Sequence, residues 1–422
     1  MQCLGFRGVG WRGLGMSTRR LSVLSQIRPA YVVWELTLRC DQPCTHCGSR
    51  AGEPRESELS EAEALAVVPQ LSALGCDEVV LIGGEAYLHP GFVAIIQALA
   101  AANIRPTMTT GGRGITAALA TQMAQAGMAS VSVSIDGTQR THDLLRAVRG
   151  GFDAACQAVR HLRSAGIVTT ANTNVNRLNL GELEALYETL KELGIAAWQV
   201  QITTPLGRAA DRPDLILQPY DLLDLLPRLA LLKQRGFADG ILMMPGNNLG
   251  YFGPEEALLR SPHPQGRDHF QGCLAGRFVM GIESDGGVKG CPSLQSDSYV
   301  GGSLKQSPLS VLWNESPQLA FTRQRSTSEL WGFCRDCDFA EVCMGGCSFT
   351  AHALFGRIGN NPYCHYRART LAKQGLRERL ILRKSAPGLP FDHALFDLVV
   401  EPLTRPEPVL PQTQLVKIRR PA

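Results

Sequence analysis

Short apolar runs rich in β-forming residues alternate with longer helical patterns from about residue 31 to about residue 205. The stretch AYVVWELTL (30–38) predicts a buried first strand, and further strands are predicted at 77–84, 105–110, 130–136, 168–175 and 197–205. Helices are predicted between them at 57–75, 90–102, 115–127, 152–165 and 181–193. Because apolar strands separated by helices form parallel sheets, six such β–α units predict an α/β fold with a partial (β/α)6 TIM-like barrel. The chemistry of such a barrel is expected at the carboxyl ends of its strands.

The remaining sequence predicts further regions around this barrel. In chain order we expect a basic, acid-free leader (1–29), the barrel (30–210), a bridging region (211–272), a small cysteine-rich domain (273–366), and a basic helix with a Pro-rich tail (367–422). The helix is expected at about 366–384, and the tail as an extended, partly ordered strap. The leader has three interpretations: a transit peptide, a disordered leader, or sequence upstream of a true start at Met16.

The composition argues against several classes of protein. The net charge is only +4, which gives no argument for nucleic-acid binding, and no apolar run is long enough to span a bilayer. The thirteen cysteines fall in tight groups separated by cysteine-poor stretches, unlike the disulfide framework of a small secreted domain. Grouped thiols indicate metal binding in a reducing compartment. We therefore expect a cytoplasmic protein with no nucleic-acid and no membrane partner.

Three cysteines follow the first predicted strand, in LTLRCDQPCTHCGSR (36–50). Three residues separate Cys40 from Cys44, and two separate Cys44 from Cys47. Thiolates suit iron–sulfur clusters, zinc and copper(I). A structural zinc site needs a fourth ligand, and His46 lies beside Cys47, where simultaneous coordination is awkward. The spacing favours an open 4Fe–4S cluster with one iron free for a small molecule, and zinc is the alternative.

This motif, after the first strand of a β/α chain, resembles the signature of the radical S-adenosylmethionine (radical SAM) superfamily. The resemblance implies that Cys40, Cys44 and Cys47 bind a catalytic 4Fe–4S cluster whose free iron chelates the amino and carboxylate groups of SAM. It also implies that one electron cleaves SAM to methionine and a 5′-deoxyadenosyl radical, which abstracts a hydrogen atom. An external donor of the flavodoxin or ferredoxin type is expected to supply that electron.

Later strand ends carry further parts of the resemblance. GGEAYLHP (83–90) is similar to the family's Gly-Gly-Glu-Pro motif, which implies that Gly83 and Gly84 approach the methionine end of SAM and that Glu85 receives its ammonium group. Ala86 replaces the usual proline, and TTGGRG (109–114) lacks the asparagine often found there. SVSIDG (132–137) resembles the fourth-strand motif that touches the ribose and carboxylate of SAM. Its candidate residues are Ser134 and Asp136, and a strand ending in an Asp-Gly turn is the alternative.

A second group of seven cysteines lies between 273 and 364. By spacing alone it could form a pair of zinc ribbons. The pattern resembles the SPASM domain, which extends radical SAM enzymes and holds two auxiliary 4Fe–4S clusters. The resemblance implies a first cluster on Cys273, Cys291 and Cys347, and a second on Cys334, Cys337, Cys343 and Cys364. The first set lacks a fourth cysteine, so either Asp268 or His269 completes it or one iron is open.

The resemblance implies a radical SAM oxidoreductase or maturase, and the substrate is the open question. We expect a peptide maturase that modifies a ribosomally made precursor peptide or a protein side chain. The first alternative is an enzyme acting on a small molecule or tetrapyrrole, as in haem side-chain processing. The second is a non-catalytic iron–sulfur electron carrier. The Cys40–Cys44–Cys47 motif together with Glu85 argues against the carrier, because a carrier needs no acid that binds SAM.

Overall fold

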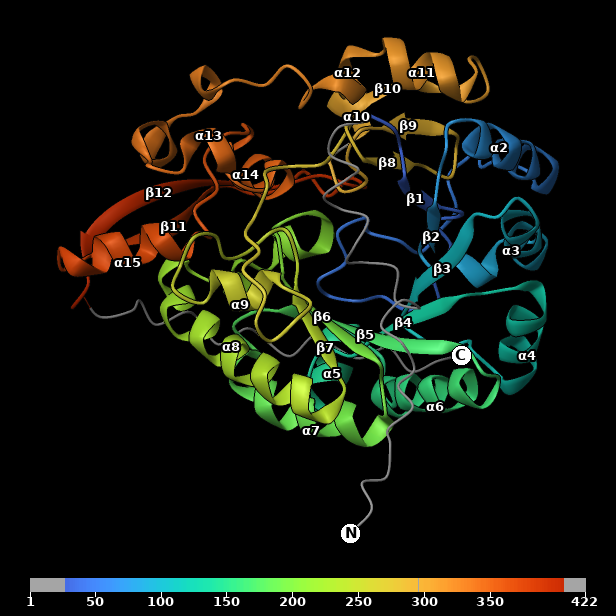
Figure 1. The fold of residues 1–422 in the computed structure, drawn as a ribbon, viewed down its shortest axis with the longest axis horizontal. Helices are drawn as coiled ribbons and strands as arrows, with labels where there is room; N and C mark the ends of the chain where they lie inside the picture. Colours follow the sequence, from blue (N-terminus) through green and yellow to red (C-terminus); the bar gives the residue numbers. More distant parts are fainter. Residues whose placement is uncertain (1–26, 295, 406–422) are drawn as a thin grey trace.

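A computed structural model describes residues 27–294 and 296–405 of the chain. Its main sheet has ten strands in the order β10-β9-β8-β1-β2-β3-β4-β5-β6-β7. Seven consecutive strands pair in parallel: β1 (Tyr31–Glu35), β2 (Glu78–Ile82), β3 (Arg105–Thr110), β4 (Ser130–Ser134), β5 (Val168–Val175), β6 (Ala197–Ile202) and β7 (Leu242–Pro245). The sheet curves into an open barrel (Figure 1). The predicted α/β partial barrel is confirmed, and β7 adds a seventh strand after the six expected.

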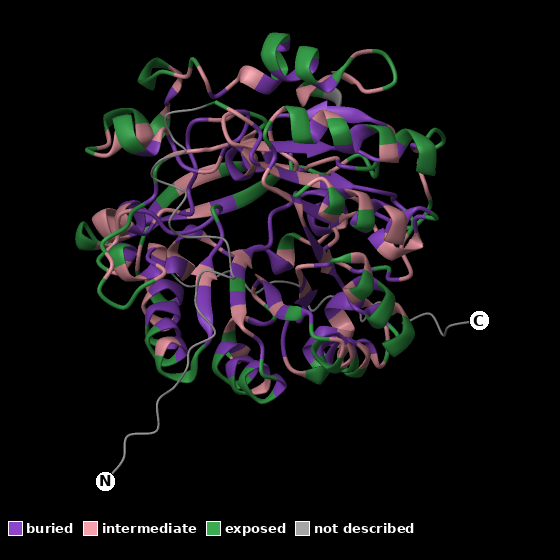
Figure 2. Cartoon of the chain, turned by 45° about the vertical axis from the view of Figure 1, so that its right-hand side comes forward, coloured by how far each residue is buried: buried purple, intermediate pink, exposed green. Residues whose placement is uncertain are grey.

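Helices cover the outside of this barrel (Figure 1). They are α2 (Glu61–Ala73), α3 (Phe92–Ala101), α4 (Ala117–Ala126), α5 (Gln139–Arg146), α6 (Gly151–Ser164), α7 (Leu183–Leu193) and α8 (Leu222–Asp239). Alternate residues of each strand face these helices, and side chains such as Trp34, Leu81, Val131 and Trp198 form the core between the two layers. Figure 2 shows buried strands enclosed by helices whose outer faces are exposed.

Local sequence signals set the helix ends. Ser60 caps α2 through a complete capping box with Glu63, which satisfies backbone N–H groups that the first turn leaves free. Gly127 and Gly194 end α4 and α7 in the left-handed conformation, which glycine adopts without steric cost. These signals explain why the predicted helix boundaries lie within a few residues of the observed ones.

The region after the barrel adds strands to the same sheet. Strand β8 (Val279–Ile282) pairs in parallel with β1, and β9 (Gly287–Lys289) and β10 (Val300–Ser303) continue the sheet in antiparallel fashion. The short helix α9 (Glu256–Arg260) precedes β8. Further short helices follow β8 in the chain: α10 (Ser296–Tyr299), α11 (Leu309–Glu315), α12 (Pro317–Ala320), α13 (Ala340–Cys343), α14 (Ser348–Phe355) and α15 (His365–Lys373). Because β8 pairs with β1, the cysteine-rich region lies against the strand that leads into the first cysteine motif.

Three elements differ from the prediction. Helix α5 lies between β4 and α6 and was not predicted, because its eight residues are too short to give a clear periodic pattern. Strand β7 falls in the expected bridging region, for which no strand was predicted. The helix predicted at 366–384 ends at Lys373, and residues 376–384 instead form strand β11 (Leu376–Lys384), which pairs with β12 (Leu395–Pro402).

The structure gives these differences a physical reason. Gly375 adopts a positive φ of 71° directly after α15 and turns the chain back on itself. In β11, Leu380 is buried in the core, and Arg377 and Arg379 pair with Glu401 of β12, so contacts across the hairpin override the helical propensity of its Arg and Glu residues. Part of the predicted strap is therefore a hairpin, and the predicted leader falls largely in residues 1–26, outside the described part of the chain.

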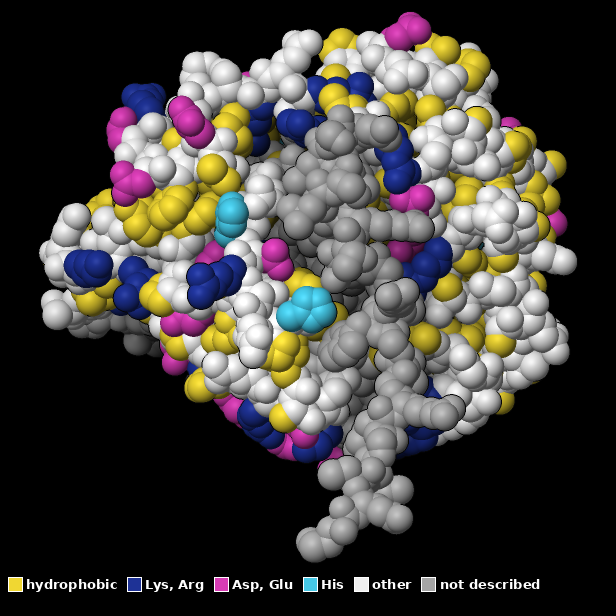
Figure 3. Space-filling view, viewed as in Figure 1, with side chains coloured by type: hydrophobic (Ala, Val, Ile, Leu, Met, Phe, Trp, Pro, Cys, Tyr) yellow, Lys and Arg dark blue, Asp and Glu magenta, His cyan; other side chains and the backbone are white. Residues whose placement is uncertain are grey.

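The surface carries mixed charge. In Figure 3, Lys and Arg side chains occur in several separate places and are interspersed with Asp and Glu. Within the described residues, no helix combines the length and the apolar character that crossing a membrane would require.

Candidate active site

The first cysteine motif forms a closed loop at the carboxyl end of β1. The Cys40 N–H donates to Gly52 O (3.1 Å), and the Gly52 N–H donates to Leu38 O (2.9 Å), so the two ends of the loop are joined. Within it, Cys40, Cys44 and Cys47 lie close enough that each thiol acts electrostatically on the others. The predicted convergence of the three thiols is observed. We call residues 38–52 the cysteine loop.

Burial keeps two of these thiols, those of Cys40 and Cys44, protonated in the absence of a positive partner. It raises the pKa of Cys44 to about 11, against the opposing effect of the Arg146 guanidinium. It also raises the pKa of Cys40, where the Glu85 carboxylate acts in the same direction. Metal binding requires thiolates, so a positively charged group must displace the protons. Three mutually close thiols, of which Cys44 is buried, fit an iron–sulfur cluster, in which each thiolate binds a different iron.

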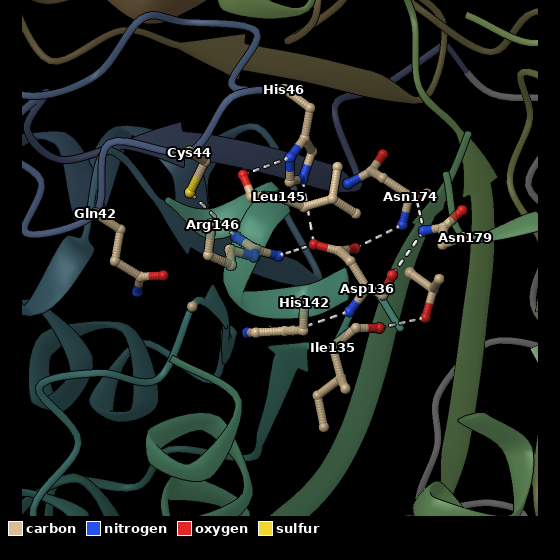
Figure 4. A network of polar contacts seen from close by, with 12 residues as sticks. Gln42, Cys44, His46, Ile135, Asp136, His142, Leu145, Arg146, Asn174 and Asn179 are labelled. Carbon is tan, nitrogen blue, oxygen red and sulfur yellow. Dashed lines mark hydrogen bonds and ion pairs between the residues drawn. The ribbon is translucent and has the colours of Figure 1, made fainter. Parts of the chain in front are cut away.

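Helix α5 holds the middle of the cysteine loop. The Leu145 carbonyl accepts hydrogen bonds from the Thr45 N–H (2.8 Å) and the Thr45 hydroxyl (3.0 Å), and it contacts His46 Nδ1 at 3.3 Å. His46 Nε2 lies 3.2 Å from Asp136 Oδ2, and Arg146 Nη2 lies 2.6 Å from the same oxygen (Figure 4). Both nitrogens of His46 are thus engaged by protein oxygens.

Asp136 is fully buried at the centre of this network. Its Oδ1 accepts from the Asn174 N–H (2.9 Å), and its own N–H donates to His142 Nδ1 (3.1 Å). Burial alone would raise the pKa of Asp136, but Arg146 and then His46 outweigh it and hold that pKa well below its usual range. The carboxylate is therefore ionised and ties β4 to the cysteine loop. Its predicted contact with the ribose or carboxylate of SAM stays a prediction.

Two buried nitrogens in this network have no partner among the described residues. They are Arg146 Nε and His142 Nε2. His142 Nδ1 accepts a hydrogen bond from the Asp136 N–H, so in the neutral ring Nε2 carries the hydrogen and is a donor. Burial, followed by the Arg146 charge, lowers the pKa of His142 to about 3. Unsatisfied buried donors are rare in native proteins. These two fit a site that is completed by an anionic or hydrogen-bond-accepting group.

The Gly-Gly-Glu turn after β2 packs directly on the cysteine loop. The Gly84 N–H donates to Thr37 O (2.7 Å) and the Glu85 N–H donates to Arg39 O (2.8 Å). A Cβ on Gly84 would lie 2.5 Å from the Arg39 carbonyl carbon, and one on Gly83 would overlap the Thr37 carbonyl oxygen. The glycines are thus needed because two backbones meet here. Their predicted approach to SAM stays a prediction.

Glu85 points into the same site from the end of this turn. Its Oε2 accepts from the Thr110 hydroxyl (2.5 Å), and its Oε1 accepts from the Gly111 N–H (2.7 Å) and the Gln42 side-chain amide (3.3 Å). Burial raises the pKa of Glu85 to about 7, and the bonds from Thr110 and Gly111 oppose that rise. An amino group arriving from a ligand would stabilise the charged form, as the prediction for this residue requires.

The segment after β3 closes the site on the opposite side. Gly111 lies against Gln42 so closely that a Cβ would be 2.7 Å from Gln42 Oε1. The Tyr87 hydroxyl donates to Asp41 (2.9 Å) and accepts from the Gly114 N–H (3.1 Å). The four strand ends β1 to β4 therefore meet around one point, as predicted. Ser134, at the end of β4, is buried beside this network, and its predicted contact with SAM stays a prediction.

The C-terminal segment covers the cysteine loop from outside. Phe391 packs on Leu38 and Ala51, next to Cys40 and Cys47. Asp392 holds the segment in place, because its carboxylate accepts from Arg50 Nε (2.9 Å).

Arg208, which follows β6, donates hydrogen bonds to the backbone of the same loop. The Arg208 N–H donates to Cys47 O (2.8 Å), and its guanidinium donates to Cys44 O (2.7 Å) and Ala51 O (3.0 Å). The cysteine loop is therefore enclosed by segments more than a hundred residues distant in sequence.

The seven later cysteines separate into the two predicted sets. Four of them, Cys334, Cys337, Cys343 and Cys364, line one cavity together with aromatic side chains. The other three, Cys273, Cys291 and Cys347, act electrostatically on one another. Cluster binding by these residues stays a prediction. The proposed fourth ligand His269 instead contacts Gln271 (2.8 Å).

Tyr251 lies between the two sets. Its hydroxyl accepts from the Cys347 N–H (3.2 Å) of the first set, and its carbonyl accepts from the Cys364 thiol (3.7 Å) of the second.

A single bound metal ion fits neither region. Across residues 27–294 and 296–405, no three Cys, His, Asp or Glu side chains converge as ligands of one ion. Cluster ligands bind separate irons and are spaced more widely than the ligands of one ion. The geometry therefore disfavours the zinc alternatives. Of the remaining cysteines, Cys76 and Cys156 are buried core residues, and Cys3 lies outside the described part of the chain.

Sequence reasoning missed several residues of the site. Arg146, Gln42 and Thr110 contact Cys44 or Glu85, and none of them was a predicted site residue, although Gln42 and Thr110 lie within the quoted motifs. The only signal for Arg146 was the short stretch THDLLR, which places apolar side chains on one side of a helix and an arginine at its end. The covering role of Phe391 and Asp392 had no sequence signal beyond the prediction of a strap.

Comparison with known proteins agrees with this geometry. The family model for the radical SAM superfamily matches residues 34–190, and a model described as an iron–sulfur cluster-binding domain (SPASM) matches residues 273–338. Together the two matches span more than half of the 422 residues.

Two curated relatives illustrate the range of similar proteins. An AdoMet-dependent heme synthase of Nitratidesulfovibrio vulgaris is 28% identical over 363 residues, covering 81% of this chain and 93% of the relative. The mycofactocin maturase MftC of Mycobacterium tuberculosis is 27% identical over 329 residues, covering 76% of this chain and 78% of the relative.

Solved structures share the fold. SuiB of Streptococcus suis bound to S-adenosylmethionine gives a TM-score of 0.62 at 17% identity, over 78% of this chain and 76% of that one. The enzyme anSMEcpe with bound AdoMet gives a TM-score of 0.65 at 17% identity, over 81% of this chain and 95% of that one. The chain is a member of the radical SAM superfamily, an enzyme family that uses S-adenosylmethionine and 4Fe–4S clusters, and it carries a C-terminal SPASM domain.

Proposed function

We propose that this enzyme cleaves SAM reductively at a cluster held by Cys40, Cys44 and Cys47, and uses the resulting radical to modify a peptide or protein side chain. The cluster, when bound, supplies the electron that breaks a carbon–sulfur bond of SAM. The protein's own part is to bind and orient SAM and the substrate and to exclude water.

The residues around the cysteine loop suit that part. The Glu85 carboxylate, held by Thr110 and Gly111, would accept a hydrogen bond from the amino group of SAM. The unpartnered donor His142 Nε2 would serve a hydrogen-bond acceptor nearby. Phe391 and the segment around it shield the loop from solvent, which would otherwise quench a radical.

The lining of the barrel interior supports a peptide substrate, and it is the observation that carries the proposal. An open cavity lies inside the barrel along the amino-terminal halves of its strands, and its lining includes Tyr31, Glu78 and Arg105, the first residues of β1, β2 and β3. Small polar residues two apart on successive strands face it: Thr107 and Thr109, Ser130 and Ser132, Thr170 and Asn172, and Gln199. Hydroxyl and amide groups of this kind match the hydrogen-bonding groups of a peptide.

The charge of this cavity is balanced. Its lining includes one cation, Arg105, and that guanidinium lies 3.3 Å from the Glu78 carboxylate. A tetrapyrrole with several carboxylates would need unpaired cations for its recognition. An uncharged peptide segment needs none, so the lining favours a peptide.

The tetrapyrrole alternative keeps one specific support. Heme synthases are among the curated relatives, and the alignment with one covers 93% of that relative's length. An external one-electron donor of the flavodoxin or ferredoxin type would serve either reaction.

A substrate-dependence assay separates the two. The reconstituted enzyme, SAM and dithionite are incubated anaerobically with either Fe-coproporphyrin III or short peptides encoded beside the gene, and 5′-deoxyadenosine is quantified. The proposal predicts that a peptide, and not the tetrapyrrole, stimulates 5′-deoxyadenosine formation and gains a mass change. Stimulation by Fe-coproporphyrin III, with loss of carboxyl groups from it, would instead establish the alternative.

A further inference from the structure

Among the described residues, Arg146 is the only cationic side chain that donates a hydrogen bond to the sulfur of a cysteine in the cysteine loop. Its Nη1 lies 3.7 Å from Cys44 Sγ, within the range of hydrogen bonds to sulfur. The side chain is at the end of α5, buried, and its guanidinium lies flat between the thiol and Asp136 (Figure 4). The contact therefore forms in a part of the protein with a low dielectric constant, where charge acts strongly.

Anchoring of the loop does not require this side chain. The backbone carbonyl of Leu145 already receives the Thr45 N–H and the Thr45 hydroxyl and contacts His46. Arg208 fixes the backbone of the loop through the carbonyls of Cys44 and Ala51. Because these other contacts already hold the loop, the Arg146 guanidinium mainly adds a positive charge next to the Cys44 sulfur.

The partner of Arg146 fixes its direction. Nη2 lies 2.6 Å from Asp136 Oδ2 while Nη1 faces Cys44, so the fork of the guanidinium spans the two groups. A lysine ammonium is a single point of charge on a flexible stem and cannot span them in the same way. His46, on the other side of Asp136, steadies the carboxylate at 3.2 Å.

Hydrogen bonds to the ligand sulfurs and the net charge nearby are among the factors that set the reduction potential of iron–sulfur clusters. A cation beside a thiolate stabilises the more negative, reduced form of the cluster and so makes its reduction easier. The negative Asp136 partly offsets this effect, since it lies next to the same guanidinium.

We propose that Arg146 is a positioning residue that raises the reduction potential of the cluster on the cysteine loop through its contact with Cys44. The negative charge of Asp136 limits the size of this effect. This inference rests on the proposed cluster binding by Cys40, Cys44 and Cys47. The redox step is the uptake of one electron by the oxidised cluster from the external donor, before any bond of SAM breaks.

The test compares variants of the reconstituted full-length enzyme. The readout is a redox titration followed by electron paramagnetic resonance, in which the relevant cluster is identified as the one whose signal changes when SAM is added. Arg146→Gln should lower the midpoint potential, so that at a fixed solution potential the ratio of reduced to oxidised cluster falls about tenfold, equal to about 59 mV for one electron. Arg146→Lys should restore part of that loss. Asp136→Asn should move the potential in the opposite direction.

The matched control is Arg208→Gln, which removes an arginine that binds the backbone of the cysteine loop and makes no hydrogen bond to sulfur. It should shift the potential of assembled clusters clearly less than Arg146→Gln does. The inference is overturned if Arg146→Gln leaves the potential unchanged, if Arg208→Gln shifts it equally, or if Asp136→Asn shifts it in the same direction as Arg146→Gln. Absence of a cluster signal that responds to SAM in the unaltered enzyme would instead refute the proposed function. If Arg146→Gln assembles no cluster, Arg146→Lys and Asp136→Asn still decide the question by the sign of their shifts.

Discussion

Replacing Gly84 by alanine should disable the site without touching a cysteine or a SAM-binding side chain. The added Cβ would lie 2.5 Å from the Arg39 carbonyl carbon and 2.6 Å from Leu38 O, and all of these atoms are backbone. No side chain can swing away to make room, so the Gly-Gly-Glu turn and the cysteine loop must separate. Overpacking of this kind costs about 1–3 kcal/mol.

Separation also breaks backbone bonds between the turn and the loop. The Glu85 N–H to Arg39 O bond, at 2.8 Å, is the nearest to the new methyl group. Its loss adds about 1 kcal/mol. The two contributions together come to about 2–4 kcal/mol, which corresponds to a loss of roughly 30- to 1000-fold in the population of the correctly formed site.

Gly52→Ala is the matched control for this experiment. Gly52 pairs with the same segment of the loop, but nothing lies within 4 Å of a Cβ added to it. Iron content, SAM affinity and 5′-deoxyadenosine formation should therefore be near normal in Gly52→Ala and strongly reduced in Gly84→Ala. Equal activity of the two variants would refute the argument that close backbone contact requires glycine at 84.

Further predictions concern the charge, the metal content and the cover of the site. Because burial sets the pKa of Glu85 at about 7 and the carboxylate is the form that binds an amino group, SAM affinity measured by calorimetry should fall as the pH drops below about 7. Glu85→Gln should bind SAM weakly with little pH dependence, and an unchanged pH profile in that variant would contradict the assignment. Iron analysis after anaerobic reconstitution should give about twelve irons per chain, and about eight when the three loop cysteines are replaced by alanine; about four irons in the unaltered chain would mean that the later cysteines bind no clusters. Asp392→Asn should loosen the segment over the cysteine loop and speed the loss of visible absorbance in air, whereas Asp397→Asn, on the exposed face of the same hairpin, should not. Equal bleaching rates would show that the segment does not shield the cluster.

The fold could be predicted from sequence wherever local and long-range signals agree. The strands β1 to β6 are apolar on the face that packs against the helices, and their helices carry caps such as Ser60 and Gly127. The prediction failed where tertiary contacts decide. The sequence around strand β7 indicates a loop because Pro245 and the following Gly246 signal a turn. Pairing with β6 nevertheless keeps the segment extended. Strand β11 has the composition of a helix and is held by β12.

The sequence could predict those site residues that belong to motifs with a recognisable spacing. The cysteines and Glu85 fall in compact motifs at strand ends, and the parallel topology brings those ends together. Arg146 and Asp392 reach the same place from segments with no such motif, because their roles depend on contacts between chain segments far apart in sequence. For Asp136, spacing indicated a ligand contact, whereas the structure shows a buried carboxylate that is engaged by His46 and Arg146.

The central claim is that this chain cleaves SAM by one-electron reduction at the cysteine loop. The most direct measurement is anaerobic: the reconstituted protein is mixed with SAM and dithionite, and 5′-deoxyadenosine is quantified by mass spectrometry beside a variant whose three loop cysteines are alanine. The account predicts 5′-deoxyadenosine from the unaltered protein and none above background from the variant. Equal amounts from both, or none from an iron-loaded unaltered protein even with a peptide that it binds, would contradict it.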